Sequence, residues 1–102
     1  MIYCIATIET KPGRRNELLT IFQGLVPKVL AEEGCIEYVP TVDMPTKFET
    51  QGPLRADVVT MVEKWKDLEA LEDHNRTPHM AEFGRQIASL VVRLDLQVLE
   101  LA

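Results

Sequence analysis

The sequence predicts one α+β domain over residues 1–102 with the ferredoxin-like element order β-α-β-β-α-β. Two observations lead to this fold class. Four segments carry the residue types or the alternation typical of strands, and stretches with helical periodicity follow the first and the third of them. This order places four antiparallel strands in one sheet, with the helices on one of its faces.

The first half of the chain contains a strand, a helix and a second strand. Residues 2–10 are rich in β-branched and aromatic residues and predict a strand. A helix is expected from Arg14, because apolar residues recur at i, i+4, i+7 and i+11. These residues are Leu18, Phe22, Leu25 and Val29. Gly34 is expected to end the helix, and residues 35–42 predict the second strand.

A long loop and a third strand follow. Residues 43–56 contain two prolines and one glycine and show no periodicity, which indicates a loop of unusual length. Such loops often have a function, and this one could cover a pocket or reach a second subunit. Residues 57–65 predict the third strand, with Val59, Met61 and Trp65 on one face.

The second helical region is predicted to consist of two helices. Asp67 can cap a helix over residues 68–75. Thr77 can cap a second helix that begins at Pro78. Proline is tolerated at this first position, because the backbone N–H that it lacks would have no partner within the helix. The second helix is expected to continue to residue 90.

The last strand leaves apolar surface without a cover. Residues 90–101 alternate between an apolar face and a polar face. The apolar face is formed by Leu90, Val92, Leu94, Leu96 and Val98, and the polar one by Arg93, Asp95 and Gln97. Further apolar residues point to the sheet face that has no helices: Tyr3, Ile5, Val39, Leu99 and Leu101. A homodimer with stacked sheets would bury them, so we expect one.

Composition narrows the classes of function. The net charge is −5 and the basic residues are scattered, which disfavours binding to nucleic acid or to an anionic membrane surface. The sequence shows neither a signal peptide nor a spanning segment of about 20 apolar residues. We therefore expect a cytoplasmic protein whose two cysteines, Cys4 and Cys35, are small reduced hydrophobes rather than a disulfide.

The candidate chemical residues lie mostly in one stretch. His74 and His79 are candidate catalytic residues, because imidazole exchanges protons near neutral pH. In one continuous helix they would not share a face, but a break at Pro78 could turn both inward. Surface positions are the alternative. No metal site is expected, since zinc needs three or four ligands and the sequence lacks a zinc-binding spacing.

Four residues are candidates for binding a substrate. Trp65 could form a wall against an aromatic molecule, and Tyr38 could donate its hydroxyl group to an oxyanion. Glu63 faces the same way as Trp65, and a carboxyl group in an apolar pocket could act as an acid or a base. Phe83 is the fourth candidate. Ordinary packing, or a solvated face for Glu63, remains the alternative for each.

Several segments resemble the antibiotic biosynthesis monooxygenase domain family. They are "ETKPGRRNELL" (9–19), "GCIEY" (34–38), "VEKW" (62–65), "LEALEDH" (68–74) and "TPHMAEF" (77–83). The resemblance covers nearly the whole chain. It implies a dimeric α/β barrel and oxidation of a quinol or related polyphenol by O2 without a cofactor. No G-x-G-x-x-G motif for a flavin or nicotinamide is present.

The chain also departs from branches of the wider superfamily. The haem-degrading branch uses an asparagine, a tryptophan and a histidine where this chain has Ala6, His74 and Gly84. Haem degradation is therefore not expected. Two other functions remain open on this fold: a non-catalytic protein that binds a small ligand, and an acid–base isomerase or mutarotase.

Overall fold

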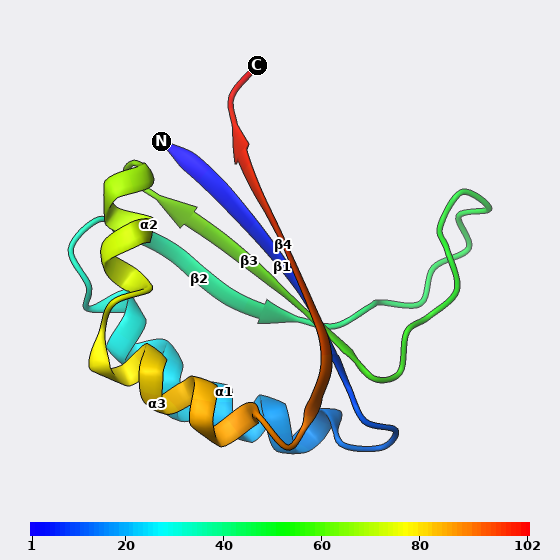
Figure 1. The fold of residues 1–102 in the computed structure, drawn as a ribbon. Helices are drawn as coiled ribbons and strands as arrows, with labels where there is room; N and C mark the ends of the chain where they lie inside the picture. Colours follow the sequence, from blue (N-terminus) through cyan, green and yellow to red (C-terminus); the bar gives the residue numbers. More distant parts are fainter.

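The computed structural model describes residues 1–102 and has the element order β1 α1 β2 β3 α2 α3 β4 (Figure 1). The strands are β1 (Ile2–Thr10), β2 (Cys35–Thr41), β3 (Val58–Trp65) and β4 (Val91–Glu100). The helices are α1 (Arg15–Leu30), α2 (Leu68–His74) and α3 (Pro78–Ile87). The strands form one antiparallel sheet in the order β2-β3-β1-β4, which confirms the predicted ferredoxin-like α+β fold.

The core lies between the helices and one face of the sheet, and Figure 1 shows all three helices on that side. The predicted apolar stripe of α1 is buried: Leu18, Phe22, Leu25 and Val29. It packs against inward-facing residues of β1 and β3, among them Cys4, Ala6, Ile8, Val59 and Met61. Burial of these side chains drives the formation of the layer.

The helices do not cover the edge strand β4. Leu94, Leu96 and Val98 pair with Ile8, Ala6 and Cys4 of β1, so they point to the helical side of the sheet. Their β1 partners are buried, yet these three side chains are 50%, 52% and 40% exposed. The core is therefore open along β4.

The predicted break between α2 and α3 is confirmed. The Asp67 carboxylate accepts a hydrogen bond from the backbone N–H of Ala70 at 2.9 Å and so caps α2. The Thr77 hydroxyl accepts from the N–H of Met80 and donates to the carbonyl of His74, and α3 then starts at Pro78. This junction fixes the positions of His74 and His79.

Two predicted helix ends were wrong. α1 ends at Leu30, and Gly34 instead forms the turn into β2 with φ +85°. A Cβ at Gly34 would lie 2.6 Å from the Cβ of Ala70, so glycine allows α2 to pack closely. α3 ends at Ile87 rather than at residue 90.

A bulge changes the predicted alternation of the last strand. The pairing of β1 with β4 shifts between Glu9 and Thr10, and Thr10 pairs with Val91. As a result Val91 packs against the core, while Val92 is 56% exposed. The predicted alternation of apolar and polar faces therefore holds only from Arg93 onward.

Residues 43–56 contain no helix or strand, as predicted, and form an arm that extends away from the sheet (Figure 1). Arg55 closes its base by donating to both carboxylate oxygens of Asp43, at 2.8 and 2.9 Å. This partner lowers the pKa of Asp43 to about 2. Three large apolar side chains of the arm are exposed: Met44, Phe48 and Leu54.

No helix of the protein combines the length and apolar character needed to cross a bilayer.

Candidate active site

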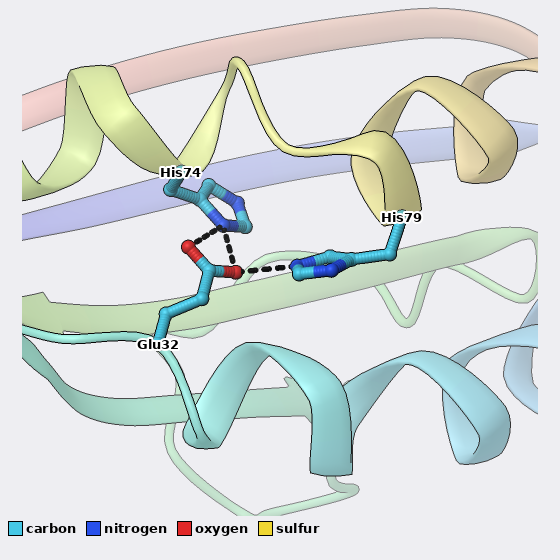
Figure 2. A group of neighbouring side chains, drawn as sticks. All are labelled: Glu32, His74 and His79. Atoms are coloured by element: carbon cyan, nitrogen blue, oxygen red, sulfur yellow. Dashed lines mark hydrogen bonds and ion pairs between the residues drawn. The ribbon is translucent and has the colours of Figure 1, made fainter.

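A carboxylate joins the two histidines. Glu32 lies just after α1, and Figure 2 shows its side chain pointing to His74 and His79 at the junction of α2 and α3. Nδ1 of His74 lies 3.1 and 2.9 Å from the two carboxylate oxygens. Nε2 of His79 lies 2.7 Å from Oε2 of the same group. The break at Pro78 therefore brings both imidazoles to one partner.

The shared carboxylate determines the tautomer of His74. An ionised carboxylate can only accept hydrogen bonds, so Nδ1 of His74 carries the hydrogen that it donates to Glu32. In the neutral ring, the other nitrogen, Nε2, then has the free lone pair. Nε2 has no hydrogen-bond partner within the chain, and His74 lines a cavity. This arrangement presents a proton acceptor to that cavity.

Aromatic side chains hold the His74 ring in place. The Trp65 ring lies with its centroid 4.7 Å from the imidazole centroid, and the Tyr38 ring meets it edge-on at 5.5 Å. His74 is only 2% exposed. A ring held by a carboxylate and two aromatic neighbours has little freedom to rotate, which favours a defined direction for Nε2.

The cavity has a volume of about 250 Å³ and lies between the sheet and the helices. This volume is slightly below the range of about 300–1,000 Å³ for ligand pockets. Most of its lining is apolar, including Ile8, Phe22, Met61, Leu71, Leu94 and Leu96. The last two belong to β4, so the cavity lies beside the open edge of the core. An apolar cavity with few polar groups is suited to a small aromatic molecule.

Three further residues with polar side chains line the cavity, Glu63, Tyr38 and Asn75, and the first two carry ionisable groups. Glu63 is 5% exposed and accepts a hydrogen bond from Nε1 of Trp65 at 3.0 Å. Burial raises the pKa of Glu63, the Trp65 hydrogen bond lowers it in part, and the charge of Glu32 raises it further. Burial and the charges of Glu63 and Glu32 also raise the pKa of Tyr38. Both groups therefore tend to keep their protons.

The thiols are not suited to nucleophilic chemistry. Cys4 and Cys35 are free, and Cys4 lines the cavity. Burial raises the pKa of Cys4 to about 12 and that of Cys35 to about 11. Because the thiolate is the reactive form, neither cysteine is activated at neutral pH.

The structure brings together four of the six residues that the sequence singled out. His74, Tyr38, Glu63 and Phe83 line the cavity. Trp65 is not among the lining residues, and its position agrees with the alternative of ordinary core packing. It is fully buried and supports His74 and Glu63 instead.

His79 also lies outside the cavity. It lines a separate groove between α1 and α3, together with Lys28 and Glu82 among others. Its side chain is 21% exposed, and its Nε2 is directed at Glu32. His79 therefore reaches the cavity only through the carboxylate that it shares with His74.

Glu32 was missed in the sequence, although a signal for it existed. The buried positions of α1 follow one another at spacings of four, three and four residues, from Leu18 to Val29. The next step of three residues leads to Glu32, whereas Glu33 falls off this stripe and is exposed. A glutamate that continues an apolar stripe is a candidate for a buried functional group.

The fold and the cavity define a small α+β protein that can hold a small molecule against an imidazole, a carboxyl group and a phenol. The chain belongs to the antibiotic biosynthesis monooxygenase family, whose sequence pattern matches residues 1–86. The predicted resemblance is thus confirmed.

Individual relatives agree with this assignment. The chain is 36% identical to the Escherichia coli protein described as "Probable quinol monooxygenase YgiN", over 98% of this chain and 97% of the relative. It is 38% identical to the Bacillus subtilis protein described as "Putative monooxygenase YcnE", over 94% and 98% of the two chains. A crystal structure of a conserved Methanosarcina mazei protein has the same fold, with a TM-score of 0.84, 24% identity, and coverage of 99% and 92%.

The buried carboxyl group of Glu63 makes stability depend on pH. Because folding raises its pKa above the ordinary value of 4.5, the unfolded chain ionises first. The contribution of Glu63 to stability is therefore retained below this value and is lost as pH rises through the folded pKa. Glu63→Gln, which keeps an acceptor for Trp65, should flatten this fall in the free energy of unfolding. Urea denaturation at a series of pH values measures this free energy. Identical pH profiles for wild type and Glu63→Gln would contradict a raised pKa of Glu63.

Proposed function

We propose that the protein is a monooxygenase that oxidises a quinol or a related polyphenol with O2 and needs no bound cofactor. The observation that carries this proposal is the arrangement of His74, which lines an apolar cavity while its Nδ1 is held by Glu32 and its Nε2 has no hydrogen-bond partner within the chain. The family match and the name of the Escherichia coli relative support the choice of reaction and substrate class.

The reaction begins with removal of a proton. Nε2 of His74 accepts the proton of a phenolic hydroxyl group, and the resulting anion is rich enough in electrons to react with O2. O2 adds to the neighbouring ring carbon and, after protonation, forms a hydroperoxide. Cleavage of the O–O bond and loss of the C–H proton release water and leave a carbonyl group. Quinol and O2 thus give hydroxyquinone and water.

Glu32 and two of the polar residues that line the cavity have roles in this sequence of steps. Glu32 stabilises the imidazolium that His74 becomes, as a carboxylate does in a catalytic triad. The raised pKa values of Tyr38 and Glu63 favour their protonated forms, which can donate hydrogen bonds to the negative oxygen atoms that form during the reaction. Phe83 and the leucines of β4 provide apolar walls against which an aromatic ring can pack.

We further propose that two chains form a homodimer through the helix-free face of the sheet. Val39, Val62 and Ile5 lie side by side across β2, β3 and β1, and Leu99 pairs with Tyr3 on the same face. Val39 and Leu99 are 45% and 43% exposed. A second copy would bury this row of apolar side chains by stacking its own sheet upon it.

The dimensions of the single chain support this assembly. Its accessible surface is 6783 Å², whereas a compact 11.6 kDa monomer exposes about 5,800 Å². Its radius of gyration is 14.1 Å, against about 13 Å for a compact domain of this length. The difference in area, about 1,000 Å², is comparable to the roughly 800 Å² that each partner buries in a standard interface. The exposed apolar arm at residues 43–56 adds to the surface that a partner could cover.

Oxygen consumption by the purified, metal-free protein tests the proposed reaction. With a panel of quinols and polyphenols, uptake should exceed the rate without protein. His74→Gln should lower turnover by about 10²–10⁴-fold, because it removes the base. Glu32→Gln should lower turnover at least about 10-fold, because it removes the charge that orients the ring. Glu33→Gln is the matched control, since it makes the same change on the neighbouring exposed residue, and should leave turnover unchanged.

Two results would contradict the proposal. Full turnover in His74→Gln would show that His74 is not the base. Absence of uptake across the panel would contradict the oxygenase, and epimerisation of a substrate without oxygen uptake would then favour the isomerase. A bound small molecule with no turnover would favour a binding protein.

Light scattering at micromolar concentration tests the dimer. The wild-type chain should have twice the monomer mass of 11.6 kDa. Leu99→Glu should shift it to the monomer, because charge opposes burial of the sheet face. Leu68→Glu makes the same change at an exposed position of α2 and should leave the dimer intact. A wild-type mass of 11.6 kDa at all concentrations would rule the dimer out.

A further inference from the structure

We propose that Glu32, His74 and His79 form a binding site for one divalent transition-metal ion, with Zn²⁺ as the reference ion. The ligand atoms are a carboxylate oxygen of Glu32, Nδ1 of His74 and Nε2 of His79, and all of them lie within 4.8 Å of one another. The site goes beyond the proposed oxygenase activity and does not depend on it.

The donor set is one that transition metals prefer. Two neutral imidazoles and one carboxylate bind zinc in catalytic centres, where a water molecule occupies the fourth position. The same set with open positions holds non-haem iron. One carboxylate charge between two neutral rings partly compensates the charge of a divalent cation.

The present contacts set the movement that an ion requires. Tetrahedral coordination with bonds of about 2.0–2.1 Å places neighbouring ligand atoms about 3.3 Å apart. Oε2 of Glu32 now lies 2.9 Å from Nδ1 of His74 and 2.7 Å from Nε2 of His79, so each of these contacts would have to lengthen by about half an ångström. The two ring nitrogens lie within 4.8 Å of each other and would have to settle at about the same 3.3 Å, a change that side-chain rotation of the partly exposed His79 can supply.

The three ligands are held by separate parts of the chain that already meet at this point. Glu32 follows α1, His74 is the last residue of α2, and His79 lies in the first turn of α3. The hydrogen bond from the Thr77 hydroxyl to the carbonyl of His74 fixes the junction between the two helices. Folding therefore already brings the three side chains together, so that metal binding loses little further conformational entropy.

An ion can enter from outside without crossing the cavity. His79 lines the groove between α1 and α3, and the side chains of His79 and Glu32 are 21% and 11% exposed. His74 is more deeply buried and faces the cavity on its other side. The ion would thus bind on the groove side of His74, with solvent available for the fourth ligand.

Metal binding would change the atom that His74 presents to the cavity. A metal on Nδ1 takes the lone pair of that nitrogen, so the hydrogen of the neutral ring must lie on Nε2. Nε2 would then be a donor instead of an acceptor. The metal-bound form and the form that accepts a proton from a substrate therefore exclude one another.

Isothermal titration of metal-free protein with Zn²⁺ tests the site directly. Wild type should bind one ion per chain. Glu32→Gln and His79→Gln should weaken binding at least about 10-fold, because each removes a ligand. His79→Gln changes a partly exposed side chain, so it preserves the buried aromatic packing around His74. Glu33→Gln is the matched control, because it removes an equal charge one residue away, and should bind as wild type does.

Cobalt absorption identifies the ligands independently. Co²⁺ in the wild-type protein should give visible bands typical of low coordination by nitrogen and oxygen, and Glu32→Gln should lose them. A sulfur-to-cobalt charge-transfer band would place the ion on a cysteine and overturn the proposal. No saturable binding by wild type, or equal affinity in wild type, Glu32→Gln and His79→Gln, would also overturn it.

Discussion

The carboxylate of Glu32 connects the parts of the molecule on which the candidate site depends. It receives hydrogen bonds from an imidazole at the end of α2 and from another at the start of α3. Because the carboxylate accepts from Nδ1 of His74, it also decides which nitrogen of that ring is free. The chemistry of the cavity thus depends on a residue that does not line it.

The two sides of this group of residues have different surroundings. On the inner side, His74 lines an apolar cavity together with Tyr38 and Glu63, whose pKa values are raised mainly by burial. On the outer side, His79 lies in a groove that reaches solvent. The inner side is suited to proton transfer with a small aromatic molecule, and the outer side to binding an ion. The two proposed functions of these three residues need different tautomers of His74 and therefore exclude one another.

Much of the fold could be predicted from local sequence patterns. Asp67, Thr77 and Pro78 predicted the break between α2 and α3, because caps and proline act on their own neighbours. The site could be predicted only in part. The contacts of Glu32 with His74 and His79 span 42 and 47 residues, so they depend on how α1 packs against the other helices. The bulge at Glu9 and Thr10 depends similarly on the pairing of distant strands.

The most direct test of this account is the tautomer of His74, measured by nitrogen-15 NMR of the metal-free protein at neutral pH. The account predicts that the neutral form of the ring carries its hydrogen on Nδ1, and it predicts that this preference weakens in Glu32→Gln. A ring with its hydrogen on Nε2 in the wild-type protein would contradict it, because the atom facing the cavity could then not accept a proton.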